Sequence, residues 1–242
     1  MTQSFKPEKA FILAAGKGER MQPLTAEKPK PMIDYRGRPI LDHALDKLRE
    51  FGVKQVVINL HYLGENIKQH LKSREDIDIL FSEEEELLDT GGGIKKALGQ
   101  FGSDPFFILS GDGPWEDVPG QAGALEQLAQ NWDSEKMDIL MLLQPVNSMT
   151  LTKGVGDYNL TENGQAIRQK DKSGDYMFTS LRIVSPKIFE NTLDGAFSFL
   201  TLMDRAESQG RLCGIAHSGI WHHLSTPQDV RQVNEYYKRD GV

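Results

Sequence analysis

Runs of consecutive apolar residues alternate, in the first half of the chain, with stretches whose apolar residues recur at helical spacing. Short apolar runs between polar segments indicate buried strands, and recurrence every three to four residues indicates helices. Because strands that alternate with helices form parallel sheets covered on both faces, the pattern predicts an α/β fold with a mainly parallel central sheet. We expect strands at 10–15, 53–59, 77–81, 106–110 and 137–143, and helices at 40–51, 65–71 and 94–101.

The second half follows a less regular pattern. Three segments, 155–160, 166–169 and 176–184, read as strands joined by turns that contain Gly, Asn and Asp, and we expect them to be antiparallel. Helical spacing returns at 197–208 and 227–237. The chain contains neither a linker composition nor an internal repeat, so we predict a single domain, 1–242, whose two halves meet at about residue 145.

Composition narrows the classes of protein that fit this pattern. Hydrophobic residues make up 38% and charged residues 26%, a globular profile, and no apolar stretch approaches the roughly 18–20 residues that span a bilayer. The segment Met1–Lys9 lacks the apolar core of a secretory signal, and a lone cysteine, Cys213, excludes an intramolecular disulfide. The net charge of −7 argues against nucleic acid as a partner. We therefore expect a cytoplasmic protein that binds neither membranes nor nucleic acid.

Basic residues nevertheless gather where the first predicted strand ends. Gly16 and Gly18 allow the backbone to turn sharply and to bring its N–H groups close to a phosphate. Lys17 and Arg20 add positive charge there, and Lys30 follows within Lys28-Pro29-Lys30-Pro31. The third glycine of a dinucleotide-binding loop and the Gly-Lys-Ser/Thr of a Walker loop are both absent. The acidic run at 83–86 is interpreted as a solvated loop rather than a site.

Two further motifs sit at predicted strand ends or helix starts. Asp112 follows an apolar strand, where its carboxylate either holds a divalent metal such as Mg²⁺ or simply forms a turn. Asp89-Thr90-Gly91-Gly92-Gly93 also admits two interpretations. Either it is a flexible turn in which Thr90 caps the next helix, or its glycines let a flat base or ribose approach the backbone.

Taken together, Gly-x-Gly-x-Arg-Met followed by Pro-Leu-Thr and Pro-Lys-Pro resembles the signature of the sugar-1-phosphate nucleotidyltransferases. The chain is most similar to their short bacterial members, of the N-acetylmuramate-1-phosphate uridylyltransferase and mannose-1-phosphate guanylyltransferase type. The resemblance implies a Rossmann-like GT-A fold, Mg²⁺ with Mn²⁺ as a substitute, and direct displacement at the α-phosphorus. It also implies that the half from residue 1 to about 145 binds the nucleotide, and that the half from about 146 to 242 adds a smaller sugar-binding β lobe.

The resemblance also assigns roles to individual residues. The catalytic residues are Arg20 and Lys30, which bind phosphates and promote departure of pyrophosphate, and Asp112, which binds metal. The sugar contacts fall in Gly-Asp-Tyr and Phe-Thr-Ser-Leu-Arg, at Asp157, Thr179 and Ser180, although relatives often have glycine where Ser180 stands. The sequence leaves Arg182, in the same segment, open to a different interpretation, as a side chain that faces solvent or forms an ordinary ion pair. The nucleotide contacts are Leu13, Ala14, Ala15, Gly16, Lys17, Gly18, Asn59, Thr90, Gly91 and Gly92.

The sequence departs from the family pattern near its end. Many relatives have an aspartate there that is the second metal ligand, and His223 occupies its place in Trp221-His222-His223-Leu224-Ser225. A neutral imidazole suits softer metals than Mg²⁺. His223 is therefore interpreted either as a weak metal ligand or as a hydrogen-bonded neighbour of the site. Thr226-Pro227 is typical of a helix start.

These assignments predict an enzyme that joins an NTP to a sugar 1-phosphate and releases pyrophosphate. UTP with N-acetylmuramate 1-phosphate or a related sugar is the favoured pair, and GTP with mannose 1-phosphate or heptose 1-phosphate is the alternative. A different class also stays open, a regulatory protein that binds nucleotide without turnover because of the change at His223. The sequence is compatible with both a monomer and a homodimer.

Overall fold

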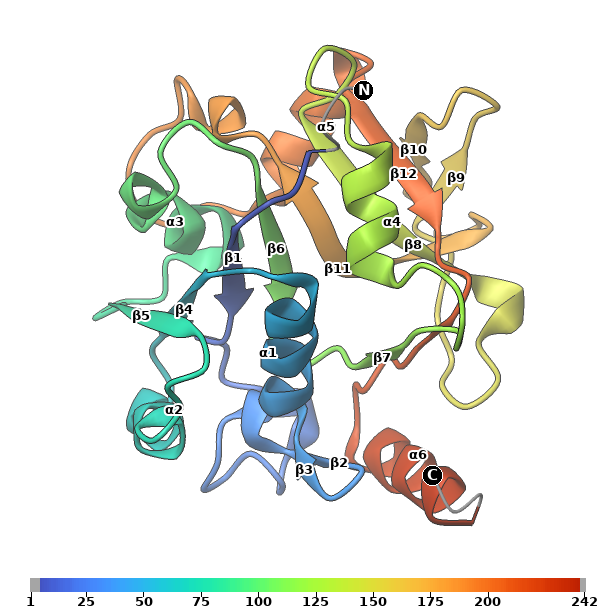
Figure 1. Ribbon diagram of the computed structural model, residues 1–242. Helices are drawn as coiled ribbons and strands as arrows, with labels where there is room; N and C mark the ends of the chain where they lie inside the picture. Colours follow the sequence, from blue (N-terminus) through green and yellow to red (C-terminus); the bar gives the residue numbers. More distant parts are fainter. Residues whose placement is uncertain (1–4, 240–242) are drawn as a thin grey trace.

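A mainly parallel sheet forms the centre of the first half of the chain in the computed structural model, which describes residues 5–239 (Figure 1). Its strands are β1 (Lys9–Leu13), β4 (Gln55–Leu60), β5 (Asp78–Glu83) and β6 (Phe106–Ser110). β1 lies between β4 and β6 and is parallel to both, and β5 is parallel to β4. The predicted α/β class is confirmed, with strand bounds within two residues of those expected.

The second half extends the same sheet to nine strands. It contributes β8 (Ile139–Pro145), β9 (Tyr158–Leu160), β10 (Ala166–Arg168), β11 (Tyr176–Val184) and β12 (Leu212–Ala216). β11 is antiparallel to β6, β8 and β9, so the antiparallel arrangement expected for this half is confirmed. The path β10-β9-β11-β6-β1-β4-β5 joins strands from both halves, while β12 pairs with β8 and was missed by the sequence analysis.

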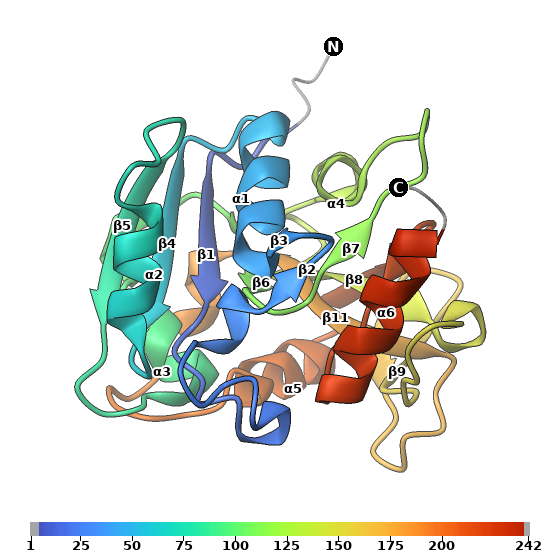
Figure 2. The same ribbon diagram turned by 90° about the horizontal axis from the view of Figure 1, so that it is seen from below.

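Helices cover both faces of this sheet (Figure 2). One face carries α1 (Ile40–Phe51), α2 (Gly64–Leu71) and α4 (Ala124–Asn131), and the other carries α3 (Asp89–Lys96) and α5 (Leu200–Ser208). In α1, Leu41, Leu45 and Leu48 are fully buried, and each such side chain contributes about 1.5–3 kcal/mol relative to an exposed one. α4 was not predicted from the sequence.

A third core holds the C-terminal helix against the segment that follows the phosphate loop. Here α6 (Pro227–Arg239) packs its buried Val230, Val233 and Tyr237 on Met21, Tyr35 and neighbouring residues. The predicted start of α6 is confirmed, because Thr226 Oγ1 accepts a hydrogen bond from Asp229 N at 3.3 Å. The segment under α6 includes the hairpin of β2 (Asp34–Tyr35) and β3 (Arg38–Pro39).

The remaining elements are short. β7 (Trp115–Glu116) pairs with β13 (Ile220–Trp221), and this pairing joins the chain after β6 to the chain before α6. The 3₁₀ helices are η1 (Glu19–Met21), η2 (Lys30–Met32), η3 (Leu98–Gln100), η4 (Val146–Ser148) and η5 (Pro186–Phe189). None of the helices within residues 5–239 combines the length and apolar character needed to cross a membrane.

Candidate active site

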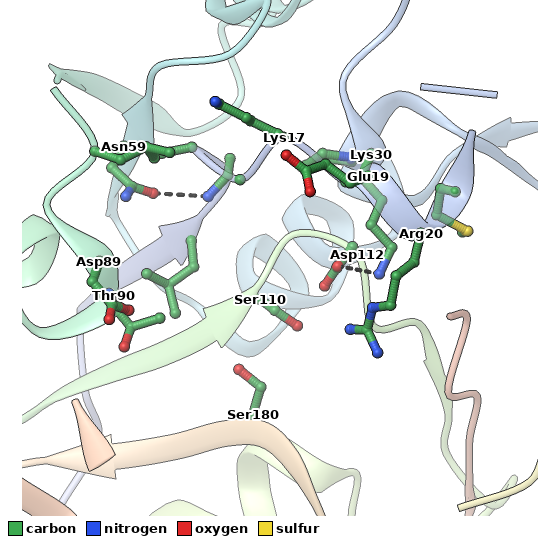
Figure 3. A pocket seen from close by; sticks show the side chains of 18 of the residues that line it. Lys17, Glu19, Arg20, Lys30, Asn59, Asp89, Thr90, Ser110, Asp112 and Ser180 are labelled. Atoms are coloured by element: carbon green, nitrogen blue, oxygen red, sulfur yellow. Dashed lines mark hydrogen bonds and ion pairs between the residues drawn. The ribbon is translucent and has the colours of Figure 1, made fainter. Parts of the chain in front are cut away.

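A cavity of about 720 Å³ opens at the carboxyl ends of β1, β4 and β6 (Figure 3). Ligands of open α/β sheets bind at this edge, and the volume suits a small organic ligand. The loop after β1, the start of η2 and the ends of the neighbouring strands surround it. Twelve of the predicted site residues line the cavity: Leu13, Ala14, Ala15, Gly16, Lys17, Gly18, Arg20, Lys30, Asn59, Thr90, Asp112 and Ser180.

The loop after β1 is held in a tight turn at Gly18. This glycine has φ of 64°, in the left-handed region, and its carbonyl accepts hydrogen bonds from Thr25 Oγ1 and from Met21 N, both at 2.9 Å. A Cβ at this position would lie 3.0 Å from Thr25 Cγ2 and 3.3 Å from Lys30 Cβ. The turn therefore needs glycine both for its backbone angle and for the contact with η2.

The substitution Gly18→Ala is expected to lower the free energy of unfolding by about 1–2 kcal/mol, because an L-residue is strained in the left-handed region. Urea unfolding followed by circular dichroism measures this change. Gly99→Ala is the matched control, because a Cβ there meets no atom within 4 Å and Gly99 has no positive φ. Equal stability of the two variants would contradict a strained turn at Gly18.

Among the described residues, the cavity wall carries one ion pair and two cations without a carboxylate partner. Lys30 Nζ lies 2.6 Å from Asp112 Oδ2, and the two side chains are 16% and 28% exposed. Within residues 5–239, neither Lys17 nor Arg20 forms an ion pair with a carboxylate. Arg20 extends toward the Lys30–Asp112 pair in Figure 3. The site therefore offers positive charge to an anionic ligand at the position predicted for the phosphates.

The side chain of Asn59, near the end of β4, forms hydrogen bonds with the residues that follow β1 and β5. Its Oδ1 accepts from Ala14 N at 2.7 Å, and its Nδ2 donates to Glu84 Oε1 at 2.7 Å. Glu84 Oε2 then accepts from Leu88 N at 3.0 Å, just before α3. The interpretation of 83–86 as a solvated loop is thus wrong for Glu84, which is buried and lines the cavity, and Glu83 ends β5.

The glycine run does not form a flexible turn. Gly91, Gly92 and Gly93 lie inside α3, which begins at Asp89, so the predicted helix start at 94 is wrong, and so is the alternative interpretation in which Thr90 caps the helix. Thr90 Oγ1 instead accepts from Phe199 N at 2.9 Å. A Cβ at Gly91 or Gly92 would overlap Phe197 or the Gly195 carbonyl. These two glycines pack behind the cavity wall and do not line the cavity itself.

The three predicted sugar contacts lie in different places. Ser180 has φ of 72° at an irregularity in the β11–β8 pairing, and its side chain faces the cavity (Figure 3). The left-handed backbone explains why glycine suits this position. Asp157 lines an adjoining pocket of about 250 Å³ that shares Leu13, Thr90 and Ser180 with the main cavity. Thr179 is buried and donates to the Leu142 carbonyl at 2.8 Å, away from the cavity lining.

His223 lies near Lys30 and Arg20 but does not line the cavity. Its ring stacks on Trp221 with centroids 5.6 Å apart, and its backbone N donates to Thr152 Oγ1 at 3.0 Å. Burial lowers the pKa of the His223 imidazole, and the charges of Lys30 and Arg20 lower it further, so the neutral ring is favoured at neutral pH. Within residues 5–239, no three or more His, Cys, Asp or Glu side chains are grouped to hold a metal ion.

Eight further residues line the cavity and were not predicted as site residues from the sequence: Glu19, Met21, Pro31, Glu84, Leu87, Asp89, Ser110 and Ser225. Two of them carried a usable signal, because Ser110 ends β6 and Glu84 follows β5, at the same sheet edge as Asn59. Glu84 was hidden by its exposed acidic neighbours, whose charge suggested a solvated loop.

Comparison with known proteins identifies the family. The MobA-like NTP transferase domain matches residues 10–171, which include the phosphate loop, Asp112 and Asp157. The chain belongs to the MobA-like NTP transferase family. Among curated members, N-acetylmuramate alpha-1-phosphate uridylyltransferase of Caulobacter vibrioides is 35% identical over 229 residues, covering 92% of this chain and 93% of that protein. The enzyme of the same name from Neisseria meningitidis serogroup B is 31% identical over 222 residues, covering 90% and 93%.

A guanylyltransferase is also similar to this MobA-like transferase, over a shorter region. The mannose-1-phosphate guanylyltransferase catalytic subunit beta of Drosophila melanogaster is 36% identical over 109 residues, 43% of this chain and 30% of that one. Among solved structures, HddC from Yersinia pseudotuberculosis with GMP-PN has a TM-score of 0.77 at 22% identity, covering 95% and 99% of the two chains. The fold class is confirmed, and so is the predicted class of sugar-1-phosphate nucleotidyltransferase.

Proposed function

We propose that this transferase joins UTP to N-acetylmuramate 1-phosphate, giving UDP-N-acetylmuramate and pyrophosphate. Two relatives that are similar over at least 90% of the chain carry this activity in their names, which supports uridylyl transfer over guanylyl transfer. The single structural observation behind the reaction is the Lys30–Asp112 pair at the open edge of the sheet, beside Arg20, which has no carboxylate partner within residues 5–239. This arrangement supplies charge for a triphosphate without any protein nucleophile.

In the proposed reaction a phosphate oxygen of the sugar 1-phosphate attacks the α-phosphorus of UTP. The new P–O bond forms as the bond from the α-phosphorus to the bridging oxygen breaks, and the electron pair leaves with pyrophosphate. The attacking oxygen is already anionic, so no general base is needed. Arg20 and Lys30 neutralise the charge that grows on the leaving group, and the loop around Gly18 positions the triphosphate through its backbone N–H groups.

The residues present fit a divalent cation only together with the substrate. Asp112 offers a single carboxylate, and Mg²⁺ is commonly held by one or two carboxylates with phosphate oxygens and water. A bound cation would supply further charge neutralisation at the phosphates. Because the ring of His223 is stacked on Trp221, we propose Asp112 as the main protein ligand and keep His223 as a predicted secondary one.

The proposal is tested by pyrophosphate release in a matrix of four nucleoside triphosphates against N-acetylmuramate, N-acetylglucosamine, mannose, glucose and heptose 1-phosphates, with Mg²⁺ or Mn²⁺. We expect release with UTP and N-acetylmuramate 1-phosphate. Release confined to GTP with mannose or heptose 1-phosphate would replace the proposal by guanylyl transfer. Nucleotide binding without release for every pair would favour a regulatory protein, and restored release in His223→Asp would trace the loss to that position.

A further inference from the structure

Arg182 is a buried cation that has no anionic partner among the described residues. The residue is 2% exposed, and its Nη1 donates to the Ser180 carbonyl at 2.8 Å. Its Nε has no hydrogen-bond partner, and within residues 5–239 no carboxylate oxygen lies within ion-pair distance of its guanidinium. The sequence-based interpretation that Arg182 faces solvent or forms an ordinary ion pair is therefore wrong.

Burying the charge of Arg182 costs free energy, and the contacts around the guanidinium offset only part of that cost. The guanidinium carbon lies 4.1 Å from the centre of the Phe199 ring and 5.5 Å from that of Phe178, so two aromatic faces stabilise the cation. Burial still lowers the pKa of Arg182 to about 9, which leaves the group charged at neutral pH. An unsatisfied donor on a buried cation is rare in native proteins and calls for a partner.

Although Arg182 is buried, it lines the adjoining pocket of about 250 Å³. The pocket shares Leu13, Thr90 and Ser180 with the main cavity, so a ligand seated there can extend toward Arg182. Two other cations line the same pocket, and both already have carboxylate partners. Arg168 Nη1 lies 2.9 Å from Asp204 Oδ1, and Lys172 Nζ lies 2.5 Å from Asp157 Oδ1. Of these three cations, Arg182 is the one that lacks such a partner in the part of the chain that the structure describes.

We propose that Arg182 forms a carboxylate subsite that selects sugar phosphates bearing an acidic substituent. This inference rests on the proposed function, since it assumes that the sugar occupies the adjoining pocket. N-Acetylmuramate carries a lactyl carboxylate, which N-acetylglucosamine lacks, and a guanidinium binds a carboxylate through paired N–H donors. A neutral sugar leaves Arg182 unpaired, so the subsite discriminates against it.

The decisive measurement is the affinity of the protein for N-acetylmuramate 1-phosphate and for N-acetylglucosamine 1-phosphate, by calorimetry, alongside kcat/KM for each with UTP. We expect the wild-type protein to prefer the acidic sugar by about 10- to 100-fold, the range of a charged hydrogen bond. Arg182→Met should bring this preference close to one through weaker binding of the acidic sugar. The KM for UTP should stay unchanged, and Arg182→Lys should recover part of the preference.

Arg205→Met is the matched control, because Arg205 lies on α5 and donates to the carbonyls of Ile188 and Glu190 rather than to the pocket. It should keep the wild-type preference. Equal affinity of the wild-type protein for the two sugars would overturn the subsite without any variant, and so would a full preference in Arg182→Met. Because calorimetry needs no turnover, absence of pyrophosphate release would count against the proposed function and leave the test of Arg182 intact.

Discussion

The substitution Arg20→Ala is expected to lower kcat by about 10²-fold or more, the cost of removing one preorganised charged donor from a developing negative charge. Arg20 lines the cavity and has no carboxylate partner within the described part of the chain. Its removal therefore leaves no orphaned charge in the protein, and the fold should be unaffected. A steady-state assay of pyrophosphate release at saturating UTP and sugar phosphate measures the change.

Arg38→Ala provides the control for the loss of an arginine. Arg38 is 49% exposed and pairs with Asp46 on the surface, where ion pairs contribute little to stability. Its kcat should match that of the wild-type protein. Near-normal turnover in Arg20→Ala, with thermal unfolding unchanged, would remove Arg20 from the catalytic residues.

Asp112→Asn is expected to lower kcat by about 10²- to 10³-fold, the range seen when a preorganised charge is lost from an active site. Two effects act together. The variant loses the carboxylate that fits a divalent cation, and Lys30 loses the partner that lies 2.6 Å from its Nζ. The measurement is pyrophosphate release as a function of Mg²⁺ concentration, in which the variant should need more Mg²⁺ for half-maximal activity.

Asp76→Asn serves as its control, because Asp76 is 40% exposed and pairs with Arg49 away from the cavity. That variant should keep both kcat and the Mg²⁺ dependence of the wild-type protein. If Asp112→Asn lowers kcat but leaves the Mg²⁺ dependence unchanged, Asp112 acts by orienting Lys30 and not by holding the cation.

Most of the fold could be predicted because each main strand is a local apolar run. α1 and β11 match their predicted bounds, since the periodicity that identifies them is also what packs them. α4 has buried residues at helical spacing, among them Leu125 and Leu128, so its pattern was present in the sequence and was overlooked. β12 was missed for a different reason. β12 is Leu-Cys-Gly-Ile-Ala, a weakly marked strand whose place is set by its parallel register with β8, more than 60 residues away in the sequence. Such long-range pairing leaves little trace in a short window of residues.

The site was predictable where a single loop supplies the chemistry, and less so where distant segments meet. Arg20 and Lys30 follow β1 closely, so their motif was visible in the sequence. The three glycines in α3 contradicted helix propensity, because close packing outweighs that preference. Gly91 and Gly92 pack against Phe197 and Gly195, and Gly93 packs against Glu84 and Asn59. The burial of Arg182 could not be predicted, because it depends on the contact with Phe199, which is distant in the sequence, and on the hydrogen bond to the Ser180 carbonyl.

The place of β6 in the sheet has a consequence for synthesis on the ribosome. β6 pairs with β1 on one side and with β11 on the other, and β11 is made only when residues 176–184 have been added. Until then the apolar Phe106–Leu109 segment carries an open backbone edge, a template for pairing with another chain. The strand that leads to Asp112 is therefore a part of the nascent protein that chaperones are expected to protect.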